Sequence, residues 1–124
     1  MSVFRKTITV SDATGGVGVA TANATSDGLI NGIITRIYLE YIDSPPAATT
    51  DVTIVEATND PAQTILTMTD AATDGWFPPM DAGVDEAGGA ILQYMPIAVN
   101  DKIKVTITGA NNGDGVVVTL VYVQ

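Results

Sequence analysis

Apolar and polar residues alternate one by one in several short runs of this chain, and this pattern strongly limits the folds open to it. In the clearest run, Lys102 to Thr108, the apolar residues Ile103, Val105 and Ile107 occupy alternate positions. Successive side chains of a β-strand point to opposite faces, so such a run buries one face and exposes the other. An amphipathic helix would instead need apolar residues three or four positions apart. The alternation therefore predicts strands.

About eight runs of this kind are predicted, most of them bounded by turn-forming Gly, Pro, Asn or Asp residues. They are Phe4 to Val10, Gly18 to Ala24, Gly32 to Asp43, Asp51 to Ala57, Gln63 to Thr69, Ala90 to Tyr94, Lys102 to Thr108 and Asp114 to Val123. Short strands at intervals of roughly 8 to 12 residues are typical of sandwiches and barrels. We therefore predict an all-β, single-domain antiparallel β-sandwich over residues 1–124. A jelly roll is the preferred topology and a Greek-key sandwich is the alternative.

The turns between these runs suggest which strands pair. Thr58 to Ala62 supplies a turn between Asp51–Ala57 and Gln63–Thr69, which form either a β-hairpin or two strands of opposite sheets. Gly109 to Gly113 separates the last two runs and contains Gly and Asn, residues that tolerate positive φ. These last two strands are expected to pair with each other in an antiparallel hairpin.

The last strand is apolar on both faces, and a strand of this kind needs cover on both sides. Val116, Val118 and Leu120 lie on one face, while Val117, Val121 and Val123 lie on the other. The cover comes either from a second sheet and a loop of the same subunit or from a neighbouring subunit.

Composition excludes several classes of function. The 124 residues include no Cys and no His, so disulfide frameworks, thiolate zinc sites and His-based nucleophile systems are ruled out. The formal net charge is -9, with 14 acidic and five basic residues, which argues against binding to nucleic acid phosphates. The basic residues are scattered and no apolar run is long enough to span a bilayer, so no membrane partner is expected.

Acidic residues on predicted loops are the remaining candidates for chemistry. Asp70 with Asp74, and Asp81 with Asp85 and Glu86, are close in sequence and could hold a hard cation. They lack EF-hand spacing, and we interpret them as solvated loop acids. We predict no catalytic residue, no cofactor and no metal, and therefore a protein that is not an enzyme.

Two segments are candidates for contacts with a partner. The segment Asp74 to Met80 gathers Trp76, Phe77, Pro79 and Met80, apolar side chains that are costly to leave exposed. It either closes the open end of the sandwich or anchors a subunit or partner interface, where Trp and other aromatics concentrate binding energy.

The second segment is the N-terminal arm, Ser2 to Lys6, which joins Phe4 to the basic residues Arg5 and Lys6. Arg5 and Lys6 could pair with acidic groups on a partner surface. The alternative is that Phe4 simply begins the first strand of the core.

Several motifs, in order and spacing, resemble a family of small phage and prophage structural proteins. They are Ile30-Asn31-Gly32, Thr50 to Ile54, Thr64 to Thr69, Thr73 to Pro78, Pro96 to Val99, Lys102 to Ile107 and Val118 to Tyr122. The chain is similar to the head decoration, or cement, proteins of tailed phages over about residue 5 to its C-terminus. Relatives in this family often carry a basic residue where this chain has Pro79-Met80.

The resemblance implies a small β-sandwich or jelly roll that binds the outer capsid surface and stabilises contacts between major capsid protein subunits. It implies a homo-oligomer, for which we favour a trimer over a dimer, on the virion surface after synthesis in the host cytoplasm. The alternative function is a carbohydrate- or receptor-binding sandwich of a phage tail or fibre, with Trp76 stacked on a sugar.

Overall fold

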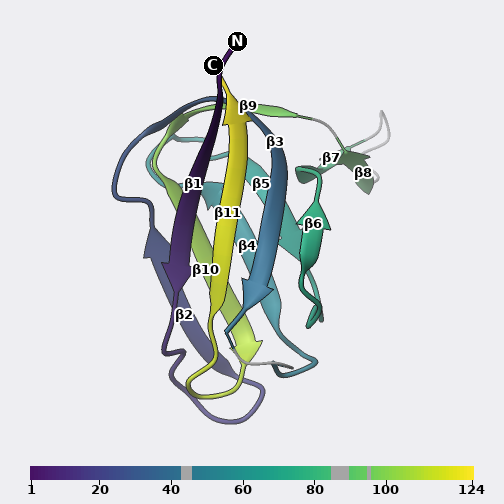
Figure 1. Ribbon diagram of the computed structural model, residues 1–124. Coiled ribbons are helices and arrows are strands. Elements are labelled where there is room, and N and C mark those ends of the chain that lie inside the picture. The colour runs from purple at the N-terminus through teal and green to yellow at the C-terminus, as the bar shows by residue number, and fades with distance from the viewer. Residues whose placement is uncertain (43–45, 85–89, 95) are drawn as a thin grey trace.

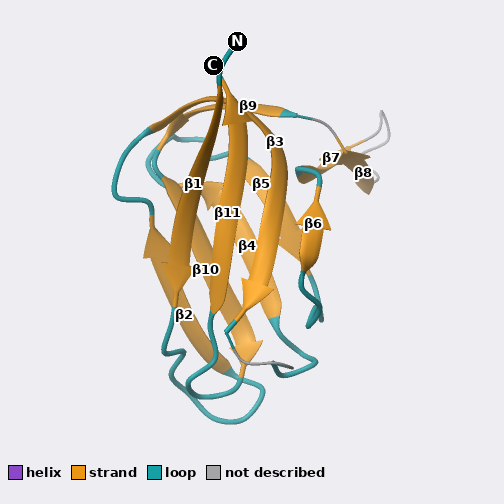
Figure 2. Ribbon diagram, viewed as in Figure 1, coloured by secondary structure: helices purple, strands orange, loops and turns teal. Residues whose placement is uncertain are grey.

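Strands make up most of the protein, and the described residues contain no helix. The computed structural model describes residues 1–42, 46–84, 90–94 and 96–124, with the backbone alone described for 80–84 and 90–94. The strands are β1 (Val3–Val10), β2 (Ala20–Thr25), β3 (Ile30–Tyr41), β4 (Asp51–Glu56), β5 (Thr64–Met68), β6 (Gly75–Phe77), β7 (Met80–Val84), β8 (Ala90–Tyr94), β9 (Ile97–Asp101), β10 (Ile103–Ala110) and β11 (Val116–Val123). Figure 2 shows these strands joined by loops, so the predicted all-β class is confirmed.

Nine of the strands form two antiparallel sheets, which lie one behind the other in Figure 1. The first, called sheet I here, has the order β1-β11-β3-β6, and β9 also pairs with β3. The second, called sheet II, has the order β2-β10-β4-β5. Strands β7 and β8 form a separate ribbon beside β6 (Figure 1). The predicted β-sandwich is therefore confirmed.

The strand order is that of a jelly roll. Four antiparallel pairs join strands from the ends of the chain inward: β1 with β11, β2 with β10, β3 with β6 and β4 with β5. Such nested pairs describe one long hairpin folded over into two sheets, which is how eight strands make a jelly roll. Strands β7, β8 and β9 lie outside this eight-stranded frame, as an insertion between β6 and β10.

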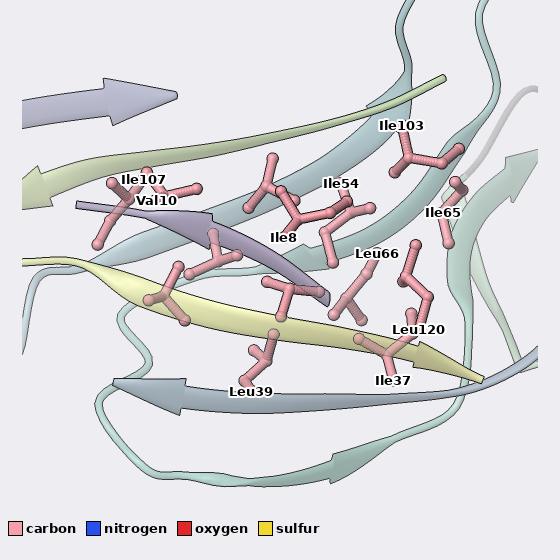
Figure 3. Close-up of a cluster of buried hydrophobic side chains, with 14 of the residues drawn as sticks. Ile8, Val10, Ile37, Leu39, Ile54, Ile65, Leu66, Ile103, Ile107 and Leu120 are labelled. Carbon is pink, nitrogen blue, oxygen red and sulfur yellow. The ribbon is translucent and has the colours of Figure 1, made fainter. Parts of the chain in front are cut away.

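The core lies between the two sheets and consists of the inward side of each strand. Ile37 and Leu39 of β3 and Leu120 of β11 are fully buried from sheet I, and Ile54 and Ile107 are fully buried from sheet II. Figure 3 shows these side chains interdigitating between the layers. Each such side chain contributes about 1.5–3 kcal/mol when removed from water. The alternation therefore marks the core positions of these strands, except at the start of β3, where a register shift buries Ile34 and leaves Ile33 43% exposed.

The expected pairing of the last two strands is wrong. Strand β10 pairs with β2 and β4 in sheet II, while β11 pairs with β1 and β3 in sheet I. Both edges of each strand are thus occupied, and the intervening turn crosses from one sheet to the other. Gly109 adopts a φ of 63° in this crossing, and a side chain there would collide with the carbonyl oxygen of Thr49.

The pairing of Asp51–Ala57 with Gln63–Thr69 has the hairpin form, because β4 and β5 are antiparallel neighbours. Three other strands were not predicted: β6, β7 and β9. Strand β6 lies within the aromatic segment Asp74 to Met80, and β7 contains Asp81, which was expected on a loop with Asp85 and Glu86. Residues 85–89 of that loop lie outside the described residues.

Candidate interaction face

The outer side of sheet I carries a cluster of aromatic and cationic side chains. Val121 of β11 is paired in register with Arg5 of β1 on one side and with Arg36 of β3 on the other. Two residues after Arg36 on β3, and on the same face, Tyr38 is paired with Trp76 of β6. Cross-strand neighbours of this kind share one face of the sheet. We call these five residues the cationic face.

Trp76 is the centre of this face. Its ring lies 5.0 Å from the ring of Tyr38, and the two planes are tilted by 58°. The guanidinium carbon of Arg36 lies 4.5 Å from the centroid of the Trp76 ring, and that of Arg5 lies 5.9 Å from it. Cation–π contacts at such distances contribute about 0.5–1 kcal/mol at exposed sites. The cluster is therefore held in one arrangement although Trp76 is 44% exposed.

The same cluster explains the cover on the second apolar face of β11. Val121 is only 6% exposed although it points away from the core. Its two register partners, Arg5 and Arg36, both reach over the Trp76 ring. Their aliphatic stems and the indole therefore cover Val121 from the same chain. Within the subunit this cover reaches Val121, whereas Val117 and Val123 of the same face are only half-buried, and the source of their cover stays a prediction.

The two arginines have no carboxylate partner among the described residues. In the part of the chain that the structure describes, the single ion pair joins Lys6 to Asp27. The hydrogen bond from Lys6 lowers the pKa of Asp27. The chain as a whole carries a net charge of -9. Two unpaired guanidinium groups beside an exposed Trp are therefore the local exception on an acidic protein, and they favour an acidic partner.

The structure separates the predicted contact residues into two groups. Arg5 and Trp76 meet on the cationic face, whereas Phe77 packs against the core and Pro79 is buried. The side chain of Met80 lies outside the described residues. Of the predicted contact residues in the aromatic segment, Trp76 is thus the one whose side chain the structure shows to be exposed.

The N-terminal residues belong to β1 rather than to a free arm. Phe4 is the second residue of this strand and stacks on Tyr122 of β11, with ring centroids 5.5 Å apart and planes at 22°. Lys6 is held by Asp27. Phe4 remains 40% exposed at the end of the sandwich where the two chain termini meet (Figure 1).

Sequence reasoning missed Arg36 and Tyr38 as members of the site. Both lie in the run Gly32 to Asp43 on the side opposite Ile37 and Leu39, so the alternation already placed them outward. Their role was missed because no strand was predicted at Trp76, so nothing in the sequence placed Trp76 beside β3.

The outer side of sheet II has a different character. One row across its four strands consists of Asn23 of β2, Thr106 of β10, Thr53 of β4 and Thr67 of β5. We call this row, together with Lys104 of the same face, the threonine face. It presents short hydroxyl and amide groups with the Lys104 ammonium group, and none of these residues is aromatic.

The acidic residues near the strand ends mainly hold backbone groups. The buried Asp101 carboxylate accepts hydrogen bonds from the Thr58 hydroxyl at 2.6 Å and from the Thr58, Asn59 and Lys102 amides at 2.7–2.8 Å. The Thr58 hydroxyl and these amides lower the pKa of Asp101 to about 2. Asp101 thereby ties the β4–β5 turn to β9, and its role is structural.

Two cavities accompany these ends. One, of about 400 Å³, is lined by amide and carboxylate side chains that include Asn31, Glu56, Asn59 and Gln63. Glu56 in its wall already accepts bonds from the Asn59 amide group at 2.9 Å and the Gln63 backbone at 2.8 Å. The other, of about 480 Å³, lies beside Trp76 and is lined by residues 70–77 with Met68.

The loop acids named as possible cation ligands do not converge on one point, and their hydrogen bonds involve backbone amides. The Asp74 carboxylate accepts a bond from the Tyr41 amide at 2.9 Å, and Asp51 accepts one from the Asp70 amide at 2.9 Å. Among the described residues, no group of three or more acidic side chains is arranged to hold a metal ion. Asp85 and Glu86 lie outside the described residues.

Comparison with known proteins leaves the family resemblance as a prediction. No protein-family model matches the chain, and no curated protein matches it. Within the described part of the chain, no helix is long and apolar enough to cross a membrane.

Proposed function

We propose that this protein is a non-enzymatic phage structural protein that binds the outer capsid surface and cements contacts between major capsid protein subunits. The single observation that carries the proposal is the cationic face, an exposed Trp bracketed by two arginines on a regular sheet. Trp, Tyr and Arg are the residues that dominate protein–protein hot spots. The partner surface it fits is a protein surface rich in carboxylates.

The jelly roll suits this role because it holds the face rigid. Arg5, Arg36 and Trp76 come from three strands of one sheet, so their relative positions are fixed by backbone hydrogen bonds before any partner arrives. Little conformational entropy is then lost on binding. A loop carrying the same residues would have to be ordered at that step.

The proposed assembly state is a cyclic homo-oligomer, with a trimer favoured over a dimer. Such an oligomer, placed where capsid subunits meet, engages several of them at once. Linked contacts of moderate strength then give an avidity well above that of each contact alone. The shell is thereby held together against outward pressure from packaged DNA.

The test is co-sedimentation of the purified protein with expanded and unexpanded capsids of a phage that encodes it, with light scattering to count subunits in the unbound state. We expect saturable binding at a fixed ratio to the major capsid protein. No binding to either particle by a folded protein would overturn the capsid proposal. Arg36→Glu should weaken binding, whereas Lys104→Glu, the matched change on the threonine face, should leave it unchanged.

The alternative, glycan binding by a tail or fibre module, rests on the exposure of Trp76. A sugar that stacks on this indole must displace the Arg36 guanidinium, which lies over the ring at 4.5 Å. Glycan binding that is lost in Trp76→Ala, together with no affinity for capsids, would favour this alternative.

A further inference from the structure

Strand β1 forms one edge of sheet I, and its outward backbone groups can be assigned. Ser2 and Gln124 exchange two backbone hydrogen bonds, at 3.2 and 3.1 Å. In an antiparallel pair, such doubly bonded positions alternate with positions whose backbone groups point away. The β1–β11 register runs without a shift along the whole strand. The N–H and C=O groups that point away from β11 are therefore those of Val3, Arg5, Thr7 and Thr9.

A bond on the far side of β11 confirms this assignment. Val121 is the register partner of Arg5, and its carbonyl oxygen accepts a bond at 3.2 Å from the Thr35 hydroxyl of β3. Its backbone acceptor thus faces β3 and not β1. Among the described residues, no backbone group bonds to the outward groups of β1.

The other edges of the sandwich are shorter or irregular. Strands β2, β5, β6 and β9 have six, five, three and five residues, and the β2–β10 and β4–β5 pairings contain register shifts. Short and bulged edges are the usual protection against unwanted strand pairing. Strand β1 has eight residues, no proline and no bulge. It therefore has the features of an edge that is open to another strand.

We propose that β1 binds by strand addition, taking as its partner an extended acidic segment of another protein. Such a strand would hydrogen-bond to the four outward positions, and its side chains would lie beside those of β1. Arg5 and Lys6 are two of only five basic residues in the chain, and both lie on this strand. Lys6 is already paired with Asp27, so Arg5, which has no carboxylate partner among the described residues, supplies the charge available to an added strand. Charge complementarity therefore selects carboxylate side chains on the added strand. This inference concerns the edge and does not depend on capsid binding.

Self-pairing of β1 is disfavoured by the same charges. A second copy that joins all four outward positions must pair Val3 with Thr9 and Arg5 with Thr7, which places Lys6 opposite Lys6. A shift by one step toward the N-terminus places Arg5 opposite Arg5. Like charges directly opposite each other destabilise a strand pair. The edge is thus suited to a different strand.

The experiment follows amide hydrogen exchange by NMR while an acetylated, amidated nonapeptide of alternating Thr and Glu is added at millimolar concentration. We expect about tenfold slower exchange at Val3, Arg5, Thr7 and Thr9, and no change at Phe4, Lys6 or Ile8, which already bond to β11. A peptide with Lys in place of Glu should have no effect. Unchanged exchange at the four outward amides would overturn the proposal.

A pair of variants tests whether the backbone carries the binding. Thr7→Pro removes one outward N–H and leaves the β11 ladder intact, so it should weaken peptide binding about tenfold, whereas Thr7→Val should not. Retained protection at Phe4 and Ile8 shows that the variant is folded. Equal peptide binding by both variants would overturn strand addition. Protection of the outward amides without peptide, lost on dilution, would show that a second copy occupies the edge and would overturn the acidic partner.

Discussion

The two outer faces of the sandwich are built on the same kind of strand but present opposite chemistry. The cationic face of sheet I gathers Trp76, Tyr38 and two arginines that have no carboxylate partner among the described residues. The threonine face of sheet II presents mainly hydroxyl and amide groups, with Lys104 as its one cation. The inward sides of both sheets are lined mainly by buried aliphatic side chains. Core packing therefore does not account for the difference between the two outer faces, which the proposed function attributes to partner binding by one of them.

The threonine face shows what a sheet looks like when solvent is its neighbour. Thr has high β propensity and is soluble, so Thr53, Thr67 and Thr106 need no further explanation. An indole left 44% exposed on the other sheet is different, because it costs solubility without adding to the core. Partner binding is the simplest compensation for that cost.

The largest effect on binding is expected from Trp76→Ala. Loss of a central hot-spot Trp commonly costs at least about 2 kcal/mol, which is about 30-fold in affinity. Thr53→Val, the matched change on the threonine face, should alter capsid affinity less than about twofold, since that face is expected to stay in solvent. Co-sedimentation at several protein concentrations measures both. Equal losses in the two variants would remove the distinction between the faces.

Charge reversal on the cationic face should have the next largest effect. Arg36→Glu places a carboxylate against an acidic partner, and we expect about tenfold weaker binding that depends steeply on salt. Lys104→Glu changes net charge equally on the threonine face. If both variants lose affinity to the same extent, the effect belongs to the total charge of the protein and the cationic face has no special role.

Sequence reasoning predicted many inward residues because side chains alternate between the two faces of a strand, and this alternation can be read from neighbouring residues alone. Ile37, Leu39 and Ile107 alternate with polar residues and are buried as expected. The pairing of β10 with β11 was predicted wrongly because Gly109 to Gly113 has the same turn chemistry in a hairpin as in a crossing between sheets. Whether the turn forms a hairpin or a crossing depends on which other strands pair with β10 and β11. Those strands, β2 and β1, are distant in sequence.

The cationic face was only half predicted for a related reason. Arg5 and Trp76 were named, but as parts of separate segments, since nothing local indicates that β1 and β6 lie in one sheet. Strand β6 has three residues, too few for alternation to be recognised. Arg36 and Tyr38 join the site only through the strand order.

Acid should weaken the hydrogen bonds by which Asp101 holds the β4–β5 turn, and it should leave the two outer faces unchanged. Asp101 has its pKa lowered from 3.8 to about 2 in the folded protein by the Thr58 hydroxyl and nearby amides. A lowered folded pKa means that the stability is present above pH 3.8 and is lost as the pH falls toward 2. Asp101→Asn should therefore be less stable than wild type at neutral pH, and the difference should shrink between pH 4 and 2. Denaturant unfolding at each pH measures this.

That difference should concern stability and leave the cationic face intact. Asp101 ties the β4–β5 turn to β9, away from Arg36 and Trp76. At neutral pH, folded Asp101→Asn should bind capsids as wild type does. A constant stability difference across the pH range would show that the carboxylate charge has no role in the tie.

The smallest expected effect on stability concerns β3, where the inward Tyr41 can be compared with the outward Tyr38. Tyr41 points inward from β3, and its hydroxyl is the one buried side-chain polar atom among the described residues that has no hydrogen-bond partner. Removing an unpaired buried hydroxyl is neutral or stabilising, so Tyr41→Phe should change the free energy of unfolding by less than about 1 kcal/mol at neutral pH. Thermal unfolding measures this change.

At alkaline pH the same substitution should become more favourable. Burial, with the nearby Asp74 charge, raises the pKa of Tyr41 from 10.0 to about 12. Because the folded pKa is raised, the wild type loses stability as the pH rises from 10 toward 12, and Tyr41→Phe removes that loss. Tyr38→Phe, on the outer side of the same strand, serves as the control and should keep the wild-type alkaline profile. If Tyr41→Phe and wild type lose stability in parallel above pH 10, the alkaline limb arises elsewhere and burial of Tyr41 does not govern it.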